Sequence, residues 1–321
     1  MIRVLATVLG LLGLAVAAAG MAVRFLPLSN QPLLIAAAAA PYLLLAAPVS
    51  AVLLLVGRRW LLVVVAVALT VATVLLYLPR YRAPAAAQLP TVSVRVLTTN
   101  LAMGQVDTAS YSALAGQRAD IVAVQEMTPQ AAAGLSRAGL DTVFPYRVIV
   151  PAEVASGIGI WSRFPIVDSG RIDGYSLPMI GTRIRIPGVR VDATVLSVHL
   201  AAPWPQDIRH WRDDIARLPQ TLSELGRTAG AGAVIVAGDY NSTADMAPFR
   251  ALLTGGYSNA VAGGGLLRTY PQNRFVPPLL GIDHILVKNA DAQSVSTVDV
   301  AGTDHLGLLA TVRLPVDMTA S

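Results

Sequence analysis

Polar side chains that can bind a metal or move a proton follow directly on apolar runs at several places in this chain. They are carboxylates, amides and imidazoles, namely Asn100, Glu126, His199, Asp239, Asn241, Asp283, Asp304 and His305. Such groups are costly to place at the ends of buried strands unless they find partners. We therefore expect them to converge on one site at one edge of the sheets. The oxygen ligands of Glu126, Asp304 and Asn100 suit Mg²⁺ or Mn²⁺ better than a soft metal.

Each of these residues has a plainer explanation when it is taken alone. Asn100 could cap a loop, and Glu126 could belong to the start of a helix that contains Pro129. His199 could be a hydrogen-bonded core histidine. Residues 238–241 could form an ordinary turn, because Gly, Asp and Asn favour turns. Only the recurrence of such groups after successive apolar runs favours a shared site.

The apolar runs that would position these residues are rich in β-branched side chains and predict strands. They cover 92–98, 121–124, 146–150, 158–161, 191–198, 234–237, 282–287 and 308–312. Between them, residues 206–227 carry apolar side chains at spacings of three and four, which predicts a helix. Residues 129–138 and 246–253 are shorter helical candidates. Many strands with a few intervening helices predict an α/β protein or a sandwich.

Seven short segments, in this order, resemble motifs of the endonuclease/exonuclease/phosphatase family, which includes deoxyribonuclease I and the bacterial sphingomyelinases. They are LTTN at 97–100, DIVAVQE at 120–126, GIGIWSRFPI at 157–166, SVHL at 197–200, GDYN at 238–241, GIDHIL at 281–286 and TDH at 303–305. The resemblance covers about 91–315. It implies a four-layer α/β sandwich, in which two packed β-sheets are flanked by helices.

The resemblance also implies a divalent-metal cofactor, Mg²⁺ with Mn²⁺ as the other option. Glu126 resembles the principal metal ligand of the family. Asn100 and Asp304 resemble its helpers, which act directly or through water. With this set the chain would be a metal-dependent phosphoric ester hydrolase.

The other matched residues resemble those that move protons and contact the phosphate. His305, oriented by Asp283, and Asp239 are alternative candidates for the base that activates the attacking water, and Asp239 could instead position the water or hold a second metal. Asn241 resembles the amide that contacts the scissile phosphate. His199 resembles the histidine that donates to a phosphate oxygen or to the leaving group. A phosphoester substrate would then be hydrolysed by water without a covalent enzyme intermediate.

The first 82 residues differ sharply from the rest of the chain. Three uncharged stretches, about 4–23, 33–57 and 60–79, are each long enough to cross a hydrocarbon core as a helix. Pro41 and Pro48 suggest kinks in the second stretch. A cleaved signal peptide would explain the first stretch alone, but three in succession favour an uncleaved, integral membrane anchor. We expect the anchor at 1–82, a linker at 83–90, the catalytic domain at 91–315 and a tail at 316–321.

Charge is distributed unevenly between these parts. Six of the 24 basic residues precede residue 83, namely Arg3, Arg24, Arg58, Arg59, Arg80 and Arg82, whereas all 19 acidic residues lie at or after Asp107. The remaining 18 basic residues leave the rest of the chain with a net charge of −1. The pI of 9.8 therefore comes from the membrane borders and is no sign of a nucleic-acid-binding surface.

The arginines also predict an orientation. The positive-inside rule places Arg3, Arg58 and Arg59 in the cytoplasm by a margin of about one charge, once the terminal amine is counted. Three spans then put the catalytic domain of a multi-pass cell-membrane protein on the extracytoplasmic side. The chain has no cysteine, which excludes disulfides, thiolate metal sites and thiol nucleophiles.

The substrate stays open. The anchor and the nearly neutral domain favour a lipid-linked or small phosphoester, diester or monoester. The family resemblance and His199 keep a membrane-tethered nuclease acting on extracellular DNA or RNA as an alternative. A non-catalytic binding protein on the same scaffold would be a third possibility. That possibility predicts losses among the metal and base positions, and none is visible.

Overall fold

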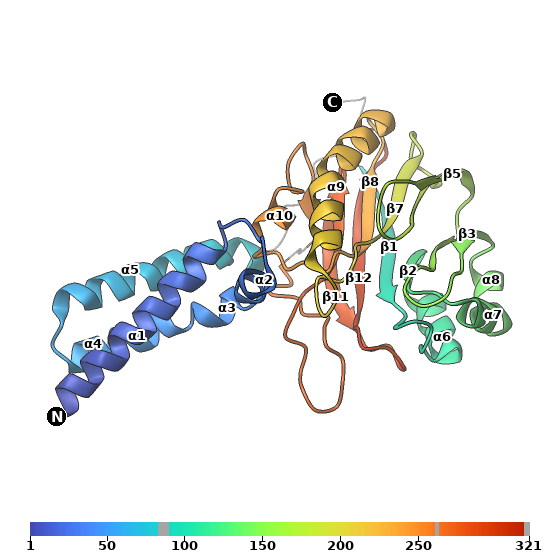
Figure 1. The fold of residues 1–321 in the computed structure, drawn as a ribbon. Helices are drawn as coiled ribbons and strands as arrows, with labels where there is room; N and C mark the ends of the chain where they lie inside the picture. The colour runs from blue at the N-terminus through green and yellow to red at the C-terminus, as the bar shows by residue number, and fades with distance from the viewer. Residues whose placement is uncertain (83–89, 261–262, 318–321) are drawn as a thin grey trace. The chain divides into compact units, whose positions relative to one another are not determined.

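The computed structural model divides into two units, and it describes residues 1–82, 90–260 and 263–317. Residues 1–82 together with 244–250 form a helical unit, and the other described residues form a β-rich unit (Figure 1). The predicted linker lies outside the described residues except for Pro90, and so do the last four residues of the predicted tail.

The helical unit consists of short and long apolar helices. They are α1 (Ile2–Val23), α2 (Gln31–Ala38), α3 (Ala40–Leu43), α4 (Ala46–Val56), α5 (Trp60–Tyr77), the 3₁₀ turn η1 (Leu78–Tyr81) and α10 (Ala247–Arg250). Two helices, α1 and α5 extended by η1, are long and apolar enough to cross a membrane. They correspond to the first and third predicted spans.

The second predicted span is wrong as one continuous helix. Residues 31–38 and 40–56 form a pair of helical segments that meet at 60°. The bend falls just before Pro41, whose ring blocks the carbonyl four residues earlier and which has no N–H to donate. Pro48 likewise leaves the carbonyl of Leu44 without its usual partner, and Ala47 bonds to that carbonyl instead. The described chain therefore has two candidate spans, or three if the bent pair counts as one.

Helix α4 and the turn before it pack closely along α1 in the opposite direction. A Cβ added at Gly10 would lie 2.7 Å from Leu54 Cγ, and one added at Gly20 would lie 2.7 Å from Leu43 Cβ. Small residues allow apolar helices to approach in this way. Because position 10 faces 54 and position 20 faces 43, the two segments are antiparallel.

A buried polar cluster marks one end of the helical unit. The guanidinium of Arg24 forms an ion pair with Asp245, the hydroxyl of Tyr77 donates to Asp245 Oδ1 over 2.9 Å, and Arg80 Nη2 lies 3.3 Å from the same oxygen. Arg24 follows α1 and Arg80 follows α5. The C-terminal ends of these two helices therefore lie at the same end of the unit.

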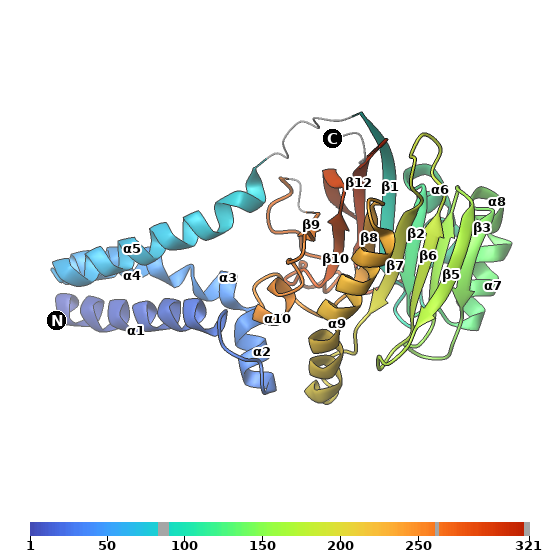
Figure 2. The same cartoon turned by 90° about the horizontal axis from the view of Figure 1, so that it is seen from above.

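The β-rich unit contains two six-stranded mixed sheets (Figure 2). In spatial order the first sheet is β11 (Asp291–Val298), β12 (Gly307–Pro315), β1 (Thr91–Asn100), β2 (Ile121–Gln125), β4 (Ile158–Ser162) and β3 (Tyr146–Val150). The second is β5 (Ile166–Ile172), β6 (Met179–Ile184), β7 (Ala193–His199), β8 (Val234–Asp239), β10 (Asp283–Lys288) and β9 (Ser258–Asn259). Among the described strands, β1 pairs in parallel with β2 and β7 with β8, and the other pairs are antiparallel.

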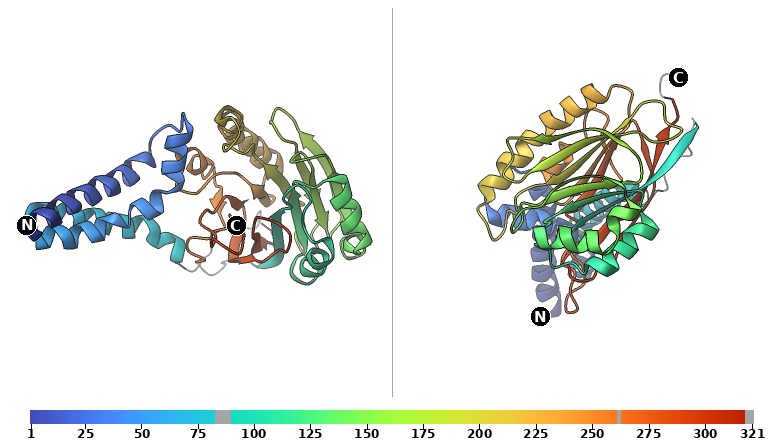
Figure 3. Two further views of the ribbon diagram at one scale, coloured as in Figure 1. Left: turned by 60° about the horizontal axis from the view of Figure 1, so that its bottom comes forward. Right: turned by 90° about the vertical axis from the view of Figure 1, so that its right-hand side faces the viewer.

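The sheets pack face to face, and helices cover their outer faces (Figure 3). Val96 and Ile160 of the first sheet and Ile235 and Ile285 of the second belong to the buried core between them. Helices α6 (Thr108–Arg118), α7 (Pro129–Arg137) and α8 (Leu140–Val143) share a second core with the other face of the first sheet. Helix α9 (Ile208–Ala229) packs on β7 and β8. The prediction of two packed sheets flanked by helices is confirmed.

The apolar pattern found α9 and eight strands, the edge strand β3 among them, but missed three edge strands and the interior strand β6. Strands β5, β6, β9 and β11 were not predicted, and β5 and β11 are largely exposed strands with few apolar residues. An edge or half-exposed strand needs no continuous apolar run, so the pattern is weak there. The helix expected at 246–253 is only the four residues of α10.

Gly157, just before β4, tests how tightly this scaffold is packed. A Cβ at this position would lie 1.8 Å from the carbonyl oxygen of Met127. We expect Gly157→Ala to cost about 1–3 kcal/mol, or about 5 °C in the unfolding midpoint of the β-rich unit, followed by tryptophan fluorescence. Gly170→Ala is the matched control, because a Cβ there meets nothing within 4 Å. Equal midpoints for the two variants would contradict this packing.

Candidate active site

The parallel strand pairs bring the predicted site residues to one edge. In the first sheet Asn100 ends β1 and is paired with Gln125 at the end of β2, so Glu126 follows at the same edge. In the second sheet His199 and Asp239 end β7 and β8 as direct partners. The carboxyl ends of parallel strands point the same way, which explains why polar groups that follow different strands meet.

Asp283 enters from the opposite direction. It opens β10, which is antiparallel to β8, and its Cα partner is Asp239. The loop before β12 adds His305. Thr303 fixes this loop, since its hydroxyl donates to the carbonyl of Asn100 over 2.7 Å and accepts from the backbone N–H of His305 over 3.2 Å.

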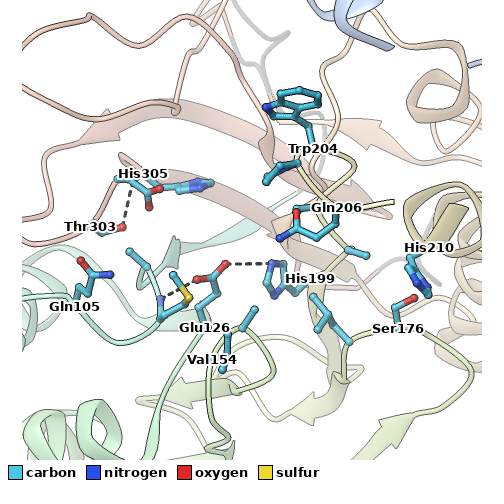
Figure 4. A pocket seen from close by; sticks show the side chains of 18 of the residues that line it. Gln105, Glu126, Val154, Ser176, His199, Trp204, Gln206, His210, Thr303 and His305 are labelled. Atoms are coloured by element: carbon cyan, nitrogen blue, oxygen red, sulfur yellow. Dashed lines mark hydrogen bonds and ion pairs between the residues drawn. The ribbon is translucent and has the colours of Figure 1, made fainter. Parts of the chain in front are cut away.

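The amide of Asn100 connects the two sheets at the site. Its Nδ2 donates to Glu126 Oε1 over 3.0 Å and to Asp239 Oδ2 over 3.1 Å. His199 Nε2 lies 3.7 Å from Glu126 Oε1 and 3.9 Å from Asp239 Oδ2, so it faces the same two carboxylates. Figure 4 shows Glu126 and His199 pointing toward one another, with His305 across the pocket.

His305 and Asp283 form a buried pair. His305 Nδ1 lies 2.9 Å from Asp283 Oδ2, which fixes the ring, and Nε2 lies 3.9 Å from Asp239 Oδ2. The ring of Tyr270 packs against the imidazole with centroids 5.0 Å apart. Neither Tyr270 nor its contact was found from the sequence, because an aromatic residue in a loop carries no periodic signal.

The buried charges shift the pKa values of these groups in different directions. Burial and the neighbouring charge of Asp283 raise the pKa of Asp239 to about 7, although His305 opposes the shift. Burial alone would lower the pKa of His305, but the charges of Asp283 and Asp239 and the hydrogen bond to Asp283 raise it to about 10. Burial lowers the pKa of His199, and Glu126 opposes this. Without a metal, Asp239 is therefore the group that titrates near neutrality.

Two site residues have a left-handed backbone. Glu126 has φ = 57° and Asn241 has φ = 47°. Asn tolerates this region, but Glu adopts it at a cost, and such strain is typical of functional positions. The strained turn places Glu126 Oε2 where it accepts from the backbone N–H of Met103 over 2.7 Å. Asn241 donates its backbone N–H to Asp239 Oδ1 over 2.7 Å and its side-chain amide to the carbonyl of Leu200 over 2.9 Å.

The site offers two groups of metal ligands. Asp239, Asp283 and His305 have ligand atoms within 4.8 Å of one another. Asp283 Oδ1 is buried and has no hydrogen-bond partner among the described residues, so it has a free acceptor position. His305 Nδ1 and Asp283 Oδ2, however, already bind each other. Glu126 and Asn100 form the other group, and their oxygens suit a hard cation.

A pocket of about 800 Å³ opens at this edge. Glu126, His199, Asp304 and His305 line it. Asp304 therefore lies at the predicted site, but its side chain is exposed and touches the others less closely. Trp204 also lines the pocket and was not found from the sequence, because the loop between β7 and α9 has no recognisable pattern.

A metal-binding measurement can tell which of the two groups of residues holds the cation. We expect Glu126→Gln to weaken binding of Mn²⁺ or Mg²⁺ by at least about tenfold in calorimetry of the full chain, because the neutral amide is a poor ligand for a hard cation. Glu224→Gln on the exposed face of α9 is the control. If Glu126→Gln bound the metal as tightly as the parent chain, Glu126 would not be a ligand.

Comparison with known proteins agrees with the fold and with the order of the motifs. The model of the endonuclease/exonuclease/phosphatase family matches residues 97–305. No curated protein matches the chain by sequence.

Several solved structures share the fold of the β-rich unit. A humanized TDP2 from D. rerio is 15% identical with a TM-score of 0.57, and the match covers 68% of this chain and 98% of that one. The human Nocturnin catalytic domain is 17% identical with a TM-score of 0.53, over 70% and 97% of the two chains. The Bacteroides thetaiotaomicron mannosyl-6-phosphatase is 15% identical with a TM-score of 0.51, over 68% and 99%.

At these identities the likeness concerns the fold alone, whereas the family model spans more than half of the sequence and includes every motif at the strand edge. The chain belongs to the endonuclease/exonuclease/phosphatase family, whose members are phosphoric ester hydrolases.

Proposed function

We propose that this chain is a membrane-anchored, Mg²⁺- or Mn²⁺-dependent phosphoesterase that hydrolyses a phosphodiester or phosphomonoester by direct attack of water. One observation carries the proposal. Six residues from both sheets, Asn100, Glu126, His199, Asp239, Asp283 and His305, meet in one bonded cluster beside a pocket. A purely structural cluster would not need two histidines and three carboxylates beside a pocket that Glu126, His199 and His305 line.

Glu126 is our principal candidate for the metal ligand, with help from Asn100 and Asp304. Their oxygens fit a hard divalent cation, and the side chain of Glu126 is partly open to the pocket. When bound, the cation would supply positive charge to the non-bridging phosphate oxygens. We leave Asp283 and His305 out of this ligand set because their positions match the family's proton-handling pair; their mutual hydrogen bond alone does not decide it, since Asn100 and Glu126 are hydrogen-bonded as well.

Asp239 is our candidate for the base that takes the proton of the attacking water. Its pKa, raised to about 7, lies where a base works efficiently at neutral pH. The higher pKa of His305 keeps its imidazole charged, so that it would stabilise the negative charge on the phosphate while Asp283 holds its ring. His199 and Asn241 complete the set as donors to phosphate oxygens or to the leaving group.

The helical unit supports an anchor that crosses the membrane an odd number of times. The segment 40–56 runs antiparallel to α1, and the residues that follow α1 and α5 meet at one cluster. With three crossings, Arg3, Arg58 and Arg59 lie on one side, and Arg24, Arg80 and Arg82 lie on the other. The positive-inside rule, with the terminal amine counted, then favours an extracytoplasmic catalytic domain.

Turnover tests the catalytic proposal. We expect the full chain to release p-nitrophenolate from bis-p-nitrophenyl phosphate in Mg²⁺ or Mn²⁺ and to stop when EDTA removes the metal. Asp239→Asn and His305→Ala should each lower kcat by about a hundredfold or more, because each removes a proton-handling or charge-stabilising group. Asp168→Asn, on the exposed part of β5, is the control. Full turnover in both site variants would refute these roles.

Metal binding without any turnover would instead favour the non-catalytic binding protein. In that case the chain would bind Mn²⁺ in calorimetry but would hydrolyse neither bis-p-nitrophenyl phosphate nor nucleic acid, phospholipid or inositol phosphate.

The orientation can be tested independently. We expect protease added to intact cells to degrade the β-rich unit while leaving the apolar helices in the membrane, since the unit would face outward. The cells must retain a cytoplasmic marker protein uncut. Protection of the β-rich unit until the cells are lysed would place it in the cytoplasm and contradict the assigned topology.

A further inference from the structure

The pocket beside the site contains no fixed positive charge. Twenty described residues line it, and Lys and Arg are absent from them. Its basic side chains, among the described residues, are limited to the imidazoles of His199, His210 and His305. A strand of nucleic acid is gripped mainly through Lys and Arg on successive phosphates. The catalytic cluster would offer positive charge to a single phosphate, and outside that cluster the described pocket residues add only the imidazole of His210.

The solvent-facing wall of the pocket is mixed, because the exposed polar side chains Gln105, Gln206, His210 and Asp304 share it with exposed apolar ones. Trp204, Val154 and Met103 line it and are 60%, 61% and 49% exposed, respectively. Ala202 and Leu177 continue the same wall. Figure 4 shows Trp204 and Val154 on opposite sides of the space beside His199. Exposed apolar side chains at a pocket are typical of a surface that binds an apolar ligand.

A buried carboxylate holds this wall in place. Asp214 of α9 accepts from the backbone N–H of Ser176 over 2.9 Å and from its hydroxyl over 3.1 Å. Its other oxygen accepts from the N–H of Ala201 over 3.3 Å. Ser176 and Ala201 both line the pocket and come from different loops. The cavity is therefore built by the fold before any ligand arrives.

We propose that this pocket binds an uncharged, apolar substituent of a phosphodiester that carries only one phosphate. This inference rests on the phosphoesterase function proposed above. Trp204, Met103 and Val154 would contact that substituent while the phosphate lies at Glu126 and His305. Polyanionic strands would bind poorly, because the described pocket residues include no Lys or Arg to pair with further phosphates. The substituent can come from a bilayer lipid or from a soluble ester, since both present the same apolar chemistry.

Two esters that share the p-nitrophenolate leaving group test this specificity. The full chain in nanodiscs with Mn²⁺ is given the ethyl and the hexyl ester of p-nitrophenyl phosphate, which differ by four methylenes and not in charge. Each methylene buried improves binding by up to about fourfold. We expect kcat/KM to be at least about tenfold higher for the hexyl ester. Trp204→Ala should bring the ratio close to one, and Trp204→Phe should restore most of it.

Phe275→Ala is the matched control, because Phe275 is an exposed aromatic residue that is not among the residues lining the pocket. It should keep the hexyl-to-ethyl ratio of the parent chain. Release of a phosphorylated headgroup from the nanodisc phospholipid would support the proposal with the bilayer as the source. A hexyl preference without such release would support it with a soluble ester as the source.

A second pair of substrates tests the effect of charge. It is the p-nitrophenyl ester of thymidine 5′-phosphate with and without a second phosphate at the 3′ position. We expect the second phosphate to lower kcat/KM. A hexyl-to-ethyl ratio near one in the parent chain would overturn this inference while leaving the phosphoesterase intact. The inference would also be overturned if the second phosphate raised kcat/KM and made kcat/KM fall steeply with salt. If none of the esters is hydrolysed, the proposed function itself fails.

Discussion

The bridge that Asn100 makes between Glu126 and Asp239 is the interaction on which the site depends. Each carboxylate follows a strand of a different sheet, and the two would repel each other without a donor between them. A buried carboxylate without partners costs several kcal/mol, so the amide both satisfies the charges and fixes the distance between the sheets at this edge. His199 and His305 then face the same carboxylates from the second sheet and from the loop before β12.

The same cluster gives its acidic groups different surroundings. Asp283 is bonded to His305, which suits the orienting role proposed for it, whereas Asp239 feels the charge of Asp283 and has its pKa raised toward neutrality. Glu126 projects from a strained turn toward the pocket, and hydrogen bonds from Asn100 and from the backbone N–H of Met103 orient the carboxylate that we propose as the metal ligand. Like charges crowded together at the mouth of a pocket are stable only if a cation or a proton offsets them, which is the physical basis for expecting a metal here.

The sequence could predict those parts of the site whose signals lie in a short stretch of the chain. Asn100, Glu126, His199 and Asp239 could be expected to meet because each lies at the end of a buried apolar run, whereas the two parallel pairings that bring these ends to one edge are seen only in the structure. The support from Thr303, Tyr270 and Asp214 could not be predicted, because a hydroxyl, a ring or a carboxylate reaches the site only through loops whose paths depend on tertiary packing. In the anchor, the apolar stretches were visible, but the 60° bend before Pro41 turned a predicted single helix into a pair.

The location of the metal is the most direct test of the account. Crystals of the full chain grown with Mn²⁺ would give anomalous scattering at the manganese absorption edge. The account predicts a peak about 2.1 Å from a carboxylate oxygen of Glu126, with Asn100 or Asp304 close enough to assist. A peak held by Asp283 and His305, with Glu126 left unbound, would contradict the assignment of ligands and of the proton-handling groups together.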